Sequence, residues 1–355
     1  MGKKIIFIIG SMRRGGAERV ISILSNHFAE MYKVEIITLL DDDNGYLLDR
    51  KIEIKSFLPS SKKTFIKILY WIKNLRKEFK KESKFYDITI ISFIARINIL
   101  VILSNMFFKN RLLISERNDP KEDGRKWYYA LLTNLLYKKA DKIIFQTHYA
   151  QGCFSKNIQK KSAIIQNPIE RKDEYKISER KYEEIILTAG RLVDQKNHFF
   201  LIKSFQYIIA KNPQLKLFIY GDGPLLKNIE SLISSLGLNN YIFVYRNDIN
   251  IFEKMQKAKI FVFSSKFEGM PNALLEAMSF GIPCVTTRFN GVDEIIENNV
   301  NGIIVDGNEI KFSDAVNDLL NNIKKYDSIS NNAIKSSKKY YINRVLSLWE
   351  KQLFR

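Results

Sequence analysis

Two glutamates in the second half of the sequence, Glu268 and Glu276, have the type and spacing to hold a polar ligand. Pro271 between them suits the first turn of a helix, so the pattern predicts a helix over 272–280. The free N–H groups at its start, on residues 272–274, favour an anion such as a nucleotide diphosphate. A carboxylate beside it can accept two hydrogen bonds from a ribose diol or from sugar hydroxyls. The two acids could instead form a hydrolase pair, but an anion site between them suits a phosphate better.

Two cations, Arg191 and Lys196, follow a strand predicted over 185–189. Open α/β sheets bind ligands beyond the carboxyl ends of their strands. Two cations five residues apart on such a loop could clamp a diphosphate, or could be solvated surface charges. The next predicted strand, over 215–220, closes with the turn Gly-Asp-Gly-Pro at 221–224, which faces the same crevice.

The first predicted strand, over 4–9, ends in a glycine-rich turn, GSMRRGGAER at 10–19. Gly10, Gly15 and Gly16 allow a tight turn and a close approach of backbone N–H groups to a phosphate or sugar diphosphate. The spacing does not match GxGxxG, and the GKS ending of a P-loop is missing. A Rossmann dehydrogenase and an NTPase are therefore both disfavoured, while a plain tight turn remains the alternative.

Short apolar runs alternate with amphipathic stretches along the whole chain. The runs lack period-2 alternation, which is typical of parallel strands covered on both faces. Strand and helix alternate in both halves, so the sequence predicts an α/β protein with two doubly wound domains. We expect these domains to span 1–168 and 169–337, with the polar segment 167–181 at the boundary. A terminal helix at about 338–355 is expected to pack back on the first domain.

The composition is that of a folded protein, with 46% hydrophobic and 27% charged residues among 355. Two cysteines and three histidines argue against a disulfide framework, a Cys-rich zinc module and a multi-histidine metal centre. No apolar run reaches about 18 residues, so no membrane span is expected. The net charge is +19, of which residues 1–170 carry +14 through 31 basic and 17 acidic residues. A positive surface in this half of the chain would suit nucleic acid, an anionic membrane or a phosphorylated substrate. The alternative is a genome-wide bias that raises the lysine content of all proteins.

Residues 62–84 predict a basic amphipathic helix, with nine basic and two acidic residues. Its apolar residues recur at helical spacing and are expected to form one face: Phe65, Ile68, Leu69, Ile72, Leu75 and Phe79. Such a helix suits an interfacial position on an anionic membrane, and an ordinary packed helix with a solvated basic face is the alternative. No signature of nucleic-acid recognition accompanies the charge, so nucleic acid is not expected as a partner.

Taken together, these motifs resemble the retaining glycosyltransferases of family 4, which have the GT-B fold. The resemblance rests on EGMPNALLEAM at 268–278, GIPCV at 281–285 and GVDEII at 291–296, and it covers nearly the whole chain. GGAE at 15–18, GRL with QK at 190–196 and GDGP at 221–224 follow in the family's order. It implies two Rossmann-like domains facing a central cleft, with the nucleotide sugar bound mainly by the second.

The resemblance also implies roles for individual residues. Arg191 and Lys196 would hold the diphosphate and, with Glu268 on the transferred sugar, would be the catalytic residues. Glu276 would bind the ribose, and main-chain groups near Tyr245 and Arg246 would recognise the base. The other donor-binding residues it implies are Gly15, Gly16, Gly269, Met270, Pro271, Asn272, Ala273 and Leu274.

One stretch departs from the family pattern. Many members carry a sugar-contacting histidine where this chain has SERNDP at 115–120. That form resembles the subgroup acting in bacterial glycan assembly, which includes N-acetylgalactosamine transferases. Glu116, Arg117 or Asn118 could take the sugar- or acceptor-facing role.

The expected activity is transfer of an N-acetylhexosamine or hexose from a UDP-sugar to a polyprenyl-linked glycan, as in capsule or other surface polysaccharide biosynthesis. No metal is expected, because no Asp-x-Asp metal motif is evident and the acidic run at 41–43 predicts a solvated turn. We expect a cytoplasmic protein bound peripherally to the inner face of the plasma membrane. Two alternatives remain: a sugar-nucleotide epimerase or hydrolase of the same fold, and a non-catalytic protein that binds membrane or nucleic acid.

Overall fold

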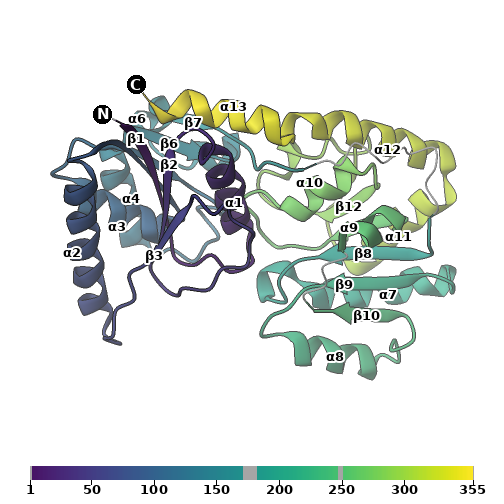
Figure 1. Ribbon diagram of the computed structural model, residues 1–355. Helices are drawn as coiled ribbons and strands as arrows, with labels where there is room; N and C mark the ends of the chain where they lie inside the picture. Colours follow the sequence, from purple (N-terminus) through teal and green to yellow (C-terminus); the bar gives the residue numbers. More distant parts are fainter. Residues whose placement is uncertain (1, 171–181, 247–250, 355) are drawn as a thin grey trace. The chain divides into compact units, whose positions relative to one another are not determined.

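The computed structural model describes residues 2–170, 182–246 and 251–354 (Figure 1). The chain forms two compact units, Met1–Pro168 with Ile342–Arg355 (unit 1) and Ile169–Tyr341 (unit 2). Most of the polar boundary segment, residues 171–181, lies outside the described residues.

Unit 1 is built on a seven-stranded parallel sheet of order β3-β2-β1-β4-β5-β6-β7. Its central strands are continuous apolar runs, and Ile5 to Ile9 in β1 are completely buried because helices cover both faces. The strands are β1 Gly2–Ile9, β2 Lys33–Thr38, β3 Glu53–Ser56, β4 Tyr86–Phe93, β5 Arg111–Ser115, β6 Lys142–Phe145 and β7 Ser162–Ile164.

Seven helices of the described part of unit 1 flank this sheet. One buried cluster joins the sheet to α1 and α13, and a second joins its other face to α2, α3, α4, α5 and α6. The helices are α1 Gly16–Phe28, α2 Thr64–Glu82, α3 Ala95–Asn105, α4 Trp127–Leu136, α5 His148–Gly152, α6 Lys156–Lys160 and α13 Ile342–Leu353.

Unit 2 has a six-stranded parallel sheet of order β10-β9-β8-β11-β12-β13. Its strands are β8 Ile185–Ala189, β9 Lys216–Tyr220, β10 Ile242–Tyr245, β11 Ile260–Phe263, β12 Cys284–Thr287 and β13 Ile303–Val305. The helices α7, α8 and α11 pack on one face, α9 and α10 pack on the other, and α12 contributes to both clusters. They are α7 His198–Lys211, α8 Leu226–Ser235, α9 Ile251–Lys257, α10 Asn272–Ser279, α11 Glu309–Asn321 and α12 Ile323–Ser337.

Both sheets confirm the predicted doubly wound architecture. In each, the strand order reverses beside the first strand, between β1 and β4 and between β8 and β11. Loops diverge at such a point and leave a crevice at the carboxyl edge of the sheet. The edge strand β3 was not predicted, since its sequence, EIKS, lacks a continuous apolar run.

The end of the chain differs from the single helix expected at about 338–355. Lys338–Tyr340 form a short 3₁₀ turn that belongs to unit 2, because Tyr340 is completely buried in the core of that unit. Tyr341 then has an extended backbone, and α13 begins at Ile342. Trp349 of α13 is completely buried in unit 1 and stacks on Phe93, with 6.0 Å between ring centroids.

The single apolar face expected on the 62–84 helix is also corrected. Leu75 and Phe79 are completely buried, and Ile72 packs against the same cluster, so the carboxyl-terminal half of α2 belongs to the core. The amino-terminal half projects its apolar side chains into solvent, with Phe65 exposed by 71% and Leu69 by 51%. The helix is longer than the core surface that it covers. Among the described residues, no helix has the length and apolarity needed to cross a bilayer.

A buried ionic network fastens α2 to the amino-terminal side of the unit 1 sheet. Lys4 Nζ on β1 lies 2.5 Å from Glu35 Oε2 and 2.8 Å from Glu82 Oε2. Lys55 Nζ on β3 lies 3.0 Å from Glu35 Oε2 and 2.7 Å from Glu78 Oε1. The three carboxylates are close enough together to suggest a metal site, but three lysines, Lys4, Lys55 and Lys81, already pair with them. We therefore interpret the cluster as structural.

The network predicts a specific acid sensitivity. Burial alone raises the pKa of Glu82, but hydrogen bonds from Lys4 and Lys81 outweigh it and lower the pKa from 4.5 to about 2. The resulting stabilisation is present above pH 4.5 and is lost as the pH falls towards 2. Glu82→Gln should cost about 1–3 kcal/mol of unfolding free energy at pH 7, and the difference from wild type should shrink between pH 5 and pH 3. Urea unfolding at each pH measures this difference.

Glu53→Gln is the matched control, since Glu53 lies 3.7 Å from Lys4 but its side chain is half exposed. We expect it to change stability by less than about 0.5 kcal/mol. A Glu82→Gln deficit that stays constant across this pH range would contradict the assignment.

Candidate functional site in unit 2

The loop after β8 is fixed by backbone contacts with the loop after β9. Gly190 N–H donates to the Tyr220 carbonyl at 2.9 Å, and Leu192 N–H donates to the Asp222 carbonyl at 2.9 Å. A side chain at Gly221 would bring its Cβ to 2.0 Å from the Gly190 carbonyl oxygen, so only glycine fits there. The interlocked loops set where the side chains that follow Gly190 begin.

Lys196 and Glu268 form an ion pair across the carboxyl edge of the sheet. Their Nζ and Oε1 atoms are 2.5 Å apart, and both side chains are largely buried. The backbone supports this pair, because Ser264 Oγ donates to the Lys196 carbonyl at 2.9 Å. Gln195 Nε2 donates to the Phe267 carbonyl at 2.8 Å and joins the same two loops. The pair presents a cation and a carboxylate together at one point of the crevice.

Arg191 lies on the same loop and is exposed to solvent. Within the described residues, no carboxylate pairs with its guanidinium. The loop therefore offers one cation that is available to an incoming anion and one, Lys196, that is held by Glu268. Sequence spacing placed both cations on this loop but gave no sign that one of them was already paired.

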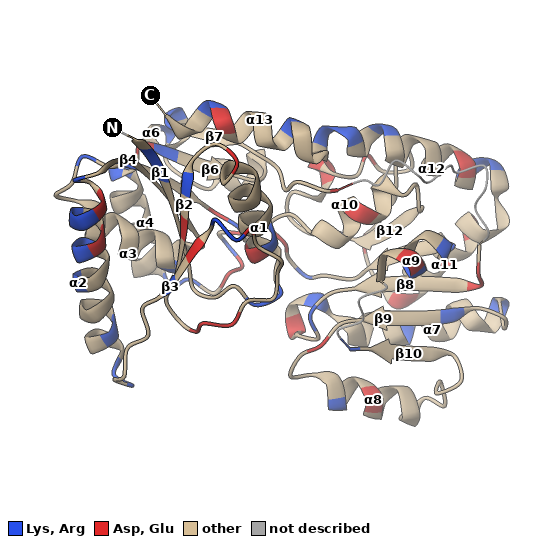
Figure 2. Ribbon diagram, in the orientation of Figure 1, with Lys and Arg blue, Asp and Glu red and all other residues tan. Residues whose placement is uncertain are grey.

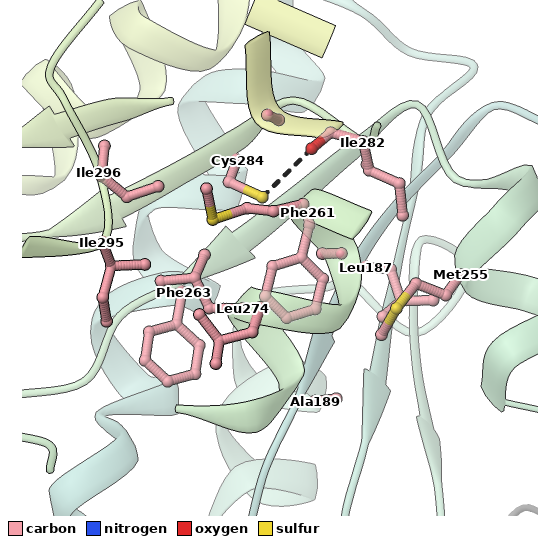
Figure 3. Close-up of a cluster of buried hydrophobic side chains, with 14 of the residues drawn as sticks. Leu187, Ala189, Met255, Phe261, Phe263, Leu274, Ile282, Cys284, Ile295 and Ile296 are labelled. Atoms are coloured by element: carbon pink, nitrogen blue, oxygen red, sulfur yellow. Dashed lines mark hydrogen bonds between the residues drawn. The ribbon is translucent and has the colours of Figure 1, made fainter. Parts of the chain in front are cut away.

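Helix α10 begins directly after the loop that carries Glu268. Its inner side chains, Leu274, Leu275 and Met278, are completely buried, and Figure 3 shows Leu274 near Phe261 and Phe263 in the core. This packing fixes the start of the helix at the edge of the sheet. Glu276, one turn further on, is 5% exposed.

The start of α10 corrects one expectation. Free N–H groups were expected on residues 272–274, but Leu274 N–H donates to the Pro271 carbonyl at 3.1 Å. Pro271 has an extended backbone and is followed by a tight first turn, which uses that donor. Gly269, Met270 and Pro271 are buried, whereas Asn272 and Ala273 are partly exposed. The predicted anion site therefore has fewer backbone donors than expected.

The end of β10 brings together groups that the sequence did not connect. Arg246 Nη2 lies 3.0 Å from Asp222 Oδ2, and the hydrogen bond lowers the pKa of the Asp222 carboxyl. The rings of Tyr220 and Tyr245 stack with 4.9 Å between centroids. Gly221 N–H donates to the Tyr245 carbonyl at 2.9 Å. The predicted base-recognition site, at Tyr245 and Arg246, therefore adjoins the interlocked glycine loops.

In unit 1, the backbone groups of Gly15 in the glycine-rich turn already form hydrogen bonds within the protein. Gly15 N–H donates to Tyr46 Oη at 2.9 Å, and the same hydroxyl donates to the Gly15 carbonyl at 2.7 Å. Arg13 pairs with Asp41 at 3.0 Å and with Asp43 at 2.7 Å, and Asp42 and Asp43 are exposed, as expected for a solvated turn. The Gly15 N–H group is therefore used internally and is not offered to a ligand.

The three residues considered for a sugar- or acceptor-facing role have different surroundings. Glu116 is 1% exposed, accepts a hydrogen bond from Tyr137 and lies 3.0 Å from Arg125 Nη2. Burial raises the pKa of Glu116 in spite of these partners. Because the Glu116 carboxylate is buried and paired, Arg117 and Asn118 are the remaining candidates, and both are partly exposed.

Arg117 is held by aromatic rings rather than by a carboxylate. Its guanidinium carbon lies 4.4 Å from the Phe93 ring centroid and 5.6 Å from that of Trp349. Nη1 donates to Asn167 Oδ1 at 2.8 Å. Burial lowers the pKa of Arg117 to about 9. Neither Asn167 nor Trp349 could be connected to Arg117 from sequence spacing.

The predicted site residues thus fall into two groups. Unit 2 brings Arg191, Lys196, Arg246, Glu276 and the loop 268–274 to one edge of one sheet. Gly15, Gly16 and residues 116–118 lie at the carboxyl edge of the other sheet, in unit 1.

Comparison with known proteins identifies the family of the chain. Residues 14–173 match the family model described as Glycosyltransferase Family 4, and residues 170–336 match that of Glycosyl transferases group 1. The chain therefore belongs to the family 4 glycosyltransferases and is a transferase enzyme.

Two curated relatives illustrate the range of similarity. An uncharacterized glycosyltransferase of Methanocaldococcus jannaschii is 32% identical over 62% of this chain and 59% of its own length. A Campylobacter jejuni α-1,4-N-acetyl-D-galactosaminyltransferase, whose name gives a diphospho-undecaprenol-linked acceptor, is 28% identical over 98% of this chain and 97% of its own. The HepE structure from Anabaena with UDP and glucose has a TM-score of 0.81 at 16% identity, covering 99% of both chains, and this likeness confirms the GT-B fold.

Proposed function

We propose that this protein is a retaining glycosyltransferase that moves an N-acetylhexosamine or hexose from a UDP-sugar to a polyprenyl-linked glycan. The observation that carries the proposal is the Lys196–Glu268 ion pair at the carboxyl edge of the unit 2 sheet, next to the start of α10. The names of two Campylobacter jejuni relatives, which give undecaprenol-linked acceptors, support the acceptor class.

The proposed division of work follows from the charges. Arg191 and Lys196 hold the diphosphate, and their positive charge stabilises the negative charge that develops on the departing UDP. Glu268 keeps Lys196 oriented and accepts hydrogen bonds from the hydroxyls of the transferred sugar. Glu276 binds the ribose diol, and the main chain at Tyr245 and Arg246 binds the base.

A panel of UDP- and GDP-sugars, with and without a polyprenyl-linked acceptor, tests the reaction class. Acceptor-dependent release of UDP supports transfer. Release at the same rate without acceptor, or conversion to an epimer, supports the hydrolase or epimerase alternative. Absence of nucleotide binding supports a non-catalytic protein.

The donor site predicts separate effects on binding and turnover. Glu276→Ala should weaken UDP binding, because it removes the ribose contact, and calorimetry measures this change. Arg191→Ala and Lys196→Ala should each lower turnover at least tenfold, or about 1.4 kcal/mol, because each removes a charge from the diphosphate.

Lys203→Ala is the matched control, since Lys203 is an exposed lysine of α7 in the same unit. It should leave both UDP affinity and turnover unchanged. Unchanged UDP binding in all three site variants, each shown to be folded, would overturn the assignment of this donor site.

We further propose that the reaction needs no divalent metal, because Arg191 and Lys196 stand where a cation would otherwise neutralise the diphosphate. Transfer activity should then persist in excess chelator. The measurement is the initial rate with and without EDTA. A rate that falls on chelation and returns with magnesium or manganese would refute the proposal.

The protein is proposed to act in the cytoplasm at the inner face of the plasma membrane, with α2 facing anionic lipid. Figure 2 shows Lys and Arg residues along this helix. Lys73, Lys77 and Lys80 are exposed, whereas Lys81 Nζ pairs with Glu82 Oε1 at 3.1 Å. Each lysine near an anionic surface contributes on the order of 1 kcal/mol, screened by salt.

Changing Lys73, Lys77 and Lys80 together to Gln should reduce sedimentation with anionic vesicles at least tenfold. Added salt should have the same effect on the wild type. Turnover on a short water-soluble acceptor should barely change, and uncharged vesicles provide the control. Equal sedimentation of wild type and variant would show that the basic face of α2 is only solvated surface.

A further inference from the structure

Helix α4 exposes large apolar side chains of the kind that a helix packed on a sheet usually buries. Its sequence, WYYALLTNLL, contains no charged residue, and in Figure 2 it carries neither blue nor red along its length. Thr133 and Leu136 face the core. Large apolar side chains at the spacing of one helical face are exposed instead: Trp127 by 80%, Tyr128 by 52%, Leu131 by 65%, Leu132 by 38% and Leu135 by 61%. A contiguous exposed apolar face marks an interaction surface.

The charges that flank α4 from Lys126 onwards are almost all positive. Residues 126–161 contain seven lysines and a single acidic residue, Asp141. Asp141 accepts a hydrogen bond from Leu112 N–H at 2.9 Å and is therefore engaged in the sheet. Exposed lysines precede and follow the helix and continue into α6: Lys126, Lys138, Lys139, Lys156, Lys160 and Lys161. Ser155 N–H donates to Asn134 Oδ1 at 3.3 Å, which keeps the start of α6 beside α4.

The position of α4 in the fold matches that of the exposed half of α2. In a sheet of parallel strands joined by helices, every crossover helix starts at the carboxyl edge. The exposed amino-terminal residues of α2, including Phe65 and Leu69, and the Trp127 end of α4 therefore both belong to the carboxyl edge of unit 1. Lys62, Lys63 and Lys126 stand directly before these helices.

We propose that α4 is a membrane-docking helix, which lies along the boundary between headgroups and acyl chains of an anionic bilayer. The inference rests on the proposed function, since a polyprenyl-linked acceptor requires access to a bilayer. Tryptophan and tyrosine at one end of an apolar face are suited to that boundary, and lysines at both ends of the helix suit anionic headgroups. A second copy of this chain would bring like charges together, so it fits the surface less well.

The test uses the full chain and vesicles containing phosphatidylglycerol. Leu131→Ser combined with Leu135→Ser should lower partitioning onto these vesicles at least tenfold, because both side chains lose their apolar contact with lipid. Phe85→Ser is the control, since Phe85 is 63% exposed in unit 1 but lies directly before β4, at the amino edge of the sheet. It should bind as the wild type does.

Trp127 gives a second readout that does not depend on the serine variants. Bromine-labelled lipids should quench the wild-type tryptophan emission, and Trp127→Phe should remove most of that quenching. The other tryptophans are Trp349, which is completely buried, and Trp71, which donates to the Phe57 carbonyl at 2.9 Å. Insertion of α4 thus predicts that most of the quenching comes from Trp127.

Several results would overturn the proposal: wild-type partitioning by the double serine variant, or no Trp127 quenching in vesicle-bound protein. A concentration-dependent dimer that the serine variant abolishes in the absence of lipid would assign the face to protein association instead. The two proposals fail separately. Loss of vesicle binding with unchanged UDP affinity and unchanged turnover on a water-soluble acceptor supports docking, whereas wild-type protein that binds vesicles but no UDP refutes only the proposed function.

Discussion

The arrangement of loops at the carboxyl edge of the unit 2 sheet depends on one backbone contact, the close packing of Gly221 against the carbonyl of Gly190. No residue with a side chain can stand at Gly221, and this restriction allows two loops from neighbouring strands to interlock. The first loop then carries Arg191 and Lys196 to the edge of the sheet, and the second carries Asp222 towards Arg246. The ion pair between Lys196 and Glu268 joins the third loop. Main-chain packing thus fixes the positions of the loops, and the loops in turn determine where the charged side chains lie.

Much of the unit 2 site could be predicted from the sequence because its parts are local. A helix starting at Pro271, two cations after a strand and a Gly-Asp-Gly turn each fall within about ten residues. The rule that parallel strands end at one edge then brings the segments together. The pairing of Lys196 with Glu268 was not predictable, because the two residues are 72 positions apart in the sequence and only the fold brings them together. The tight first turn of α10 was missed because a pattern does not show which N–H groups a helix uses itself.

Unit 1 was harder to predict, because its important contacts join residues of unrelated character. Nothing in the spacing connects Tyr46 with Gly15, or Arg125 and Tyr137 with Glu116. The apolar content of α4 and α3 is similar, yet α3 is buried and α4 exposes most of its large side chains. Periodicity identifies an apolar helix face, but only the packed structure shows whether the protein itself covers that face.

The assignment of α13 to unit 1 has a consequence for how the chain is made. Its residues complete the core formed by the start of the sequence: Thr89 Oγ1 donates to the Leu353 carbonyl at 2.8 Å, and Trp349 is completely buried. During synthesis, unit 2 emerges whole from the ribosome while unit 1 still lacks one of its helices. The unit that is translated first is therefore the last to be finished. Until residue 353 emerges, the apolar surface of unit 1 that α13 covers stays exposed unless a chaperone binds it.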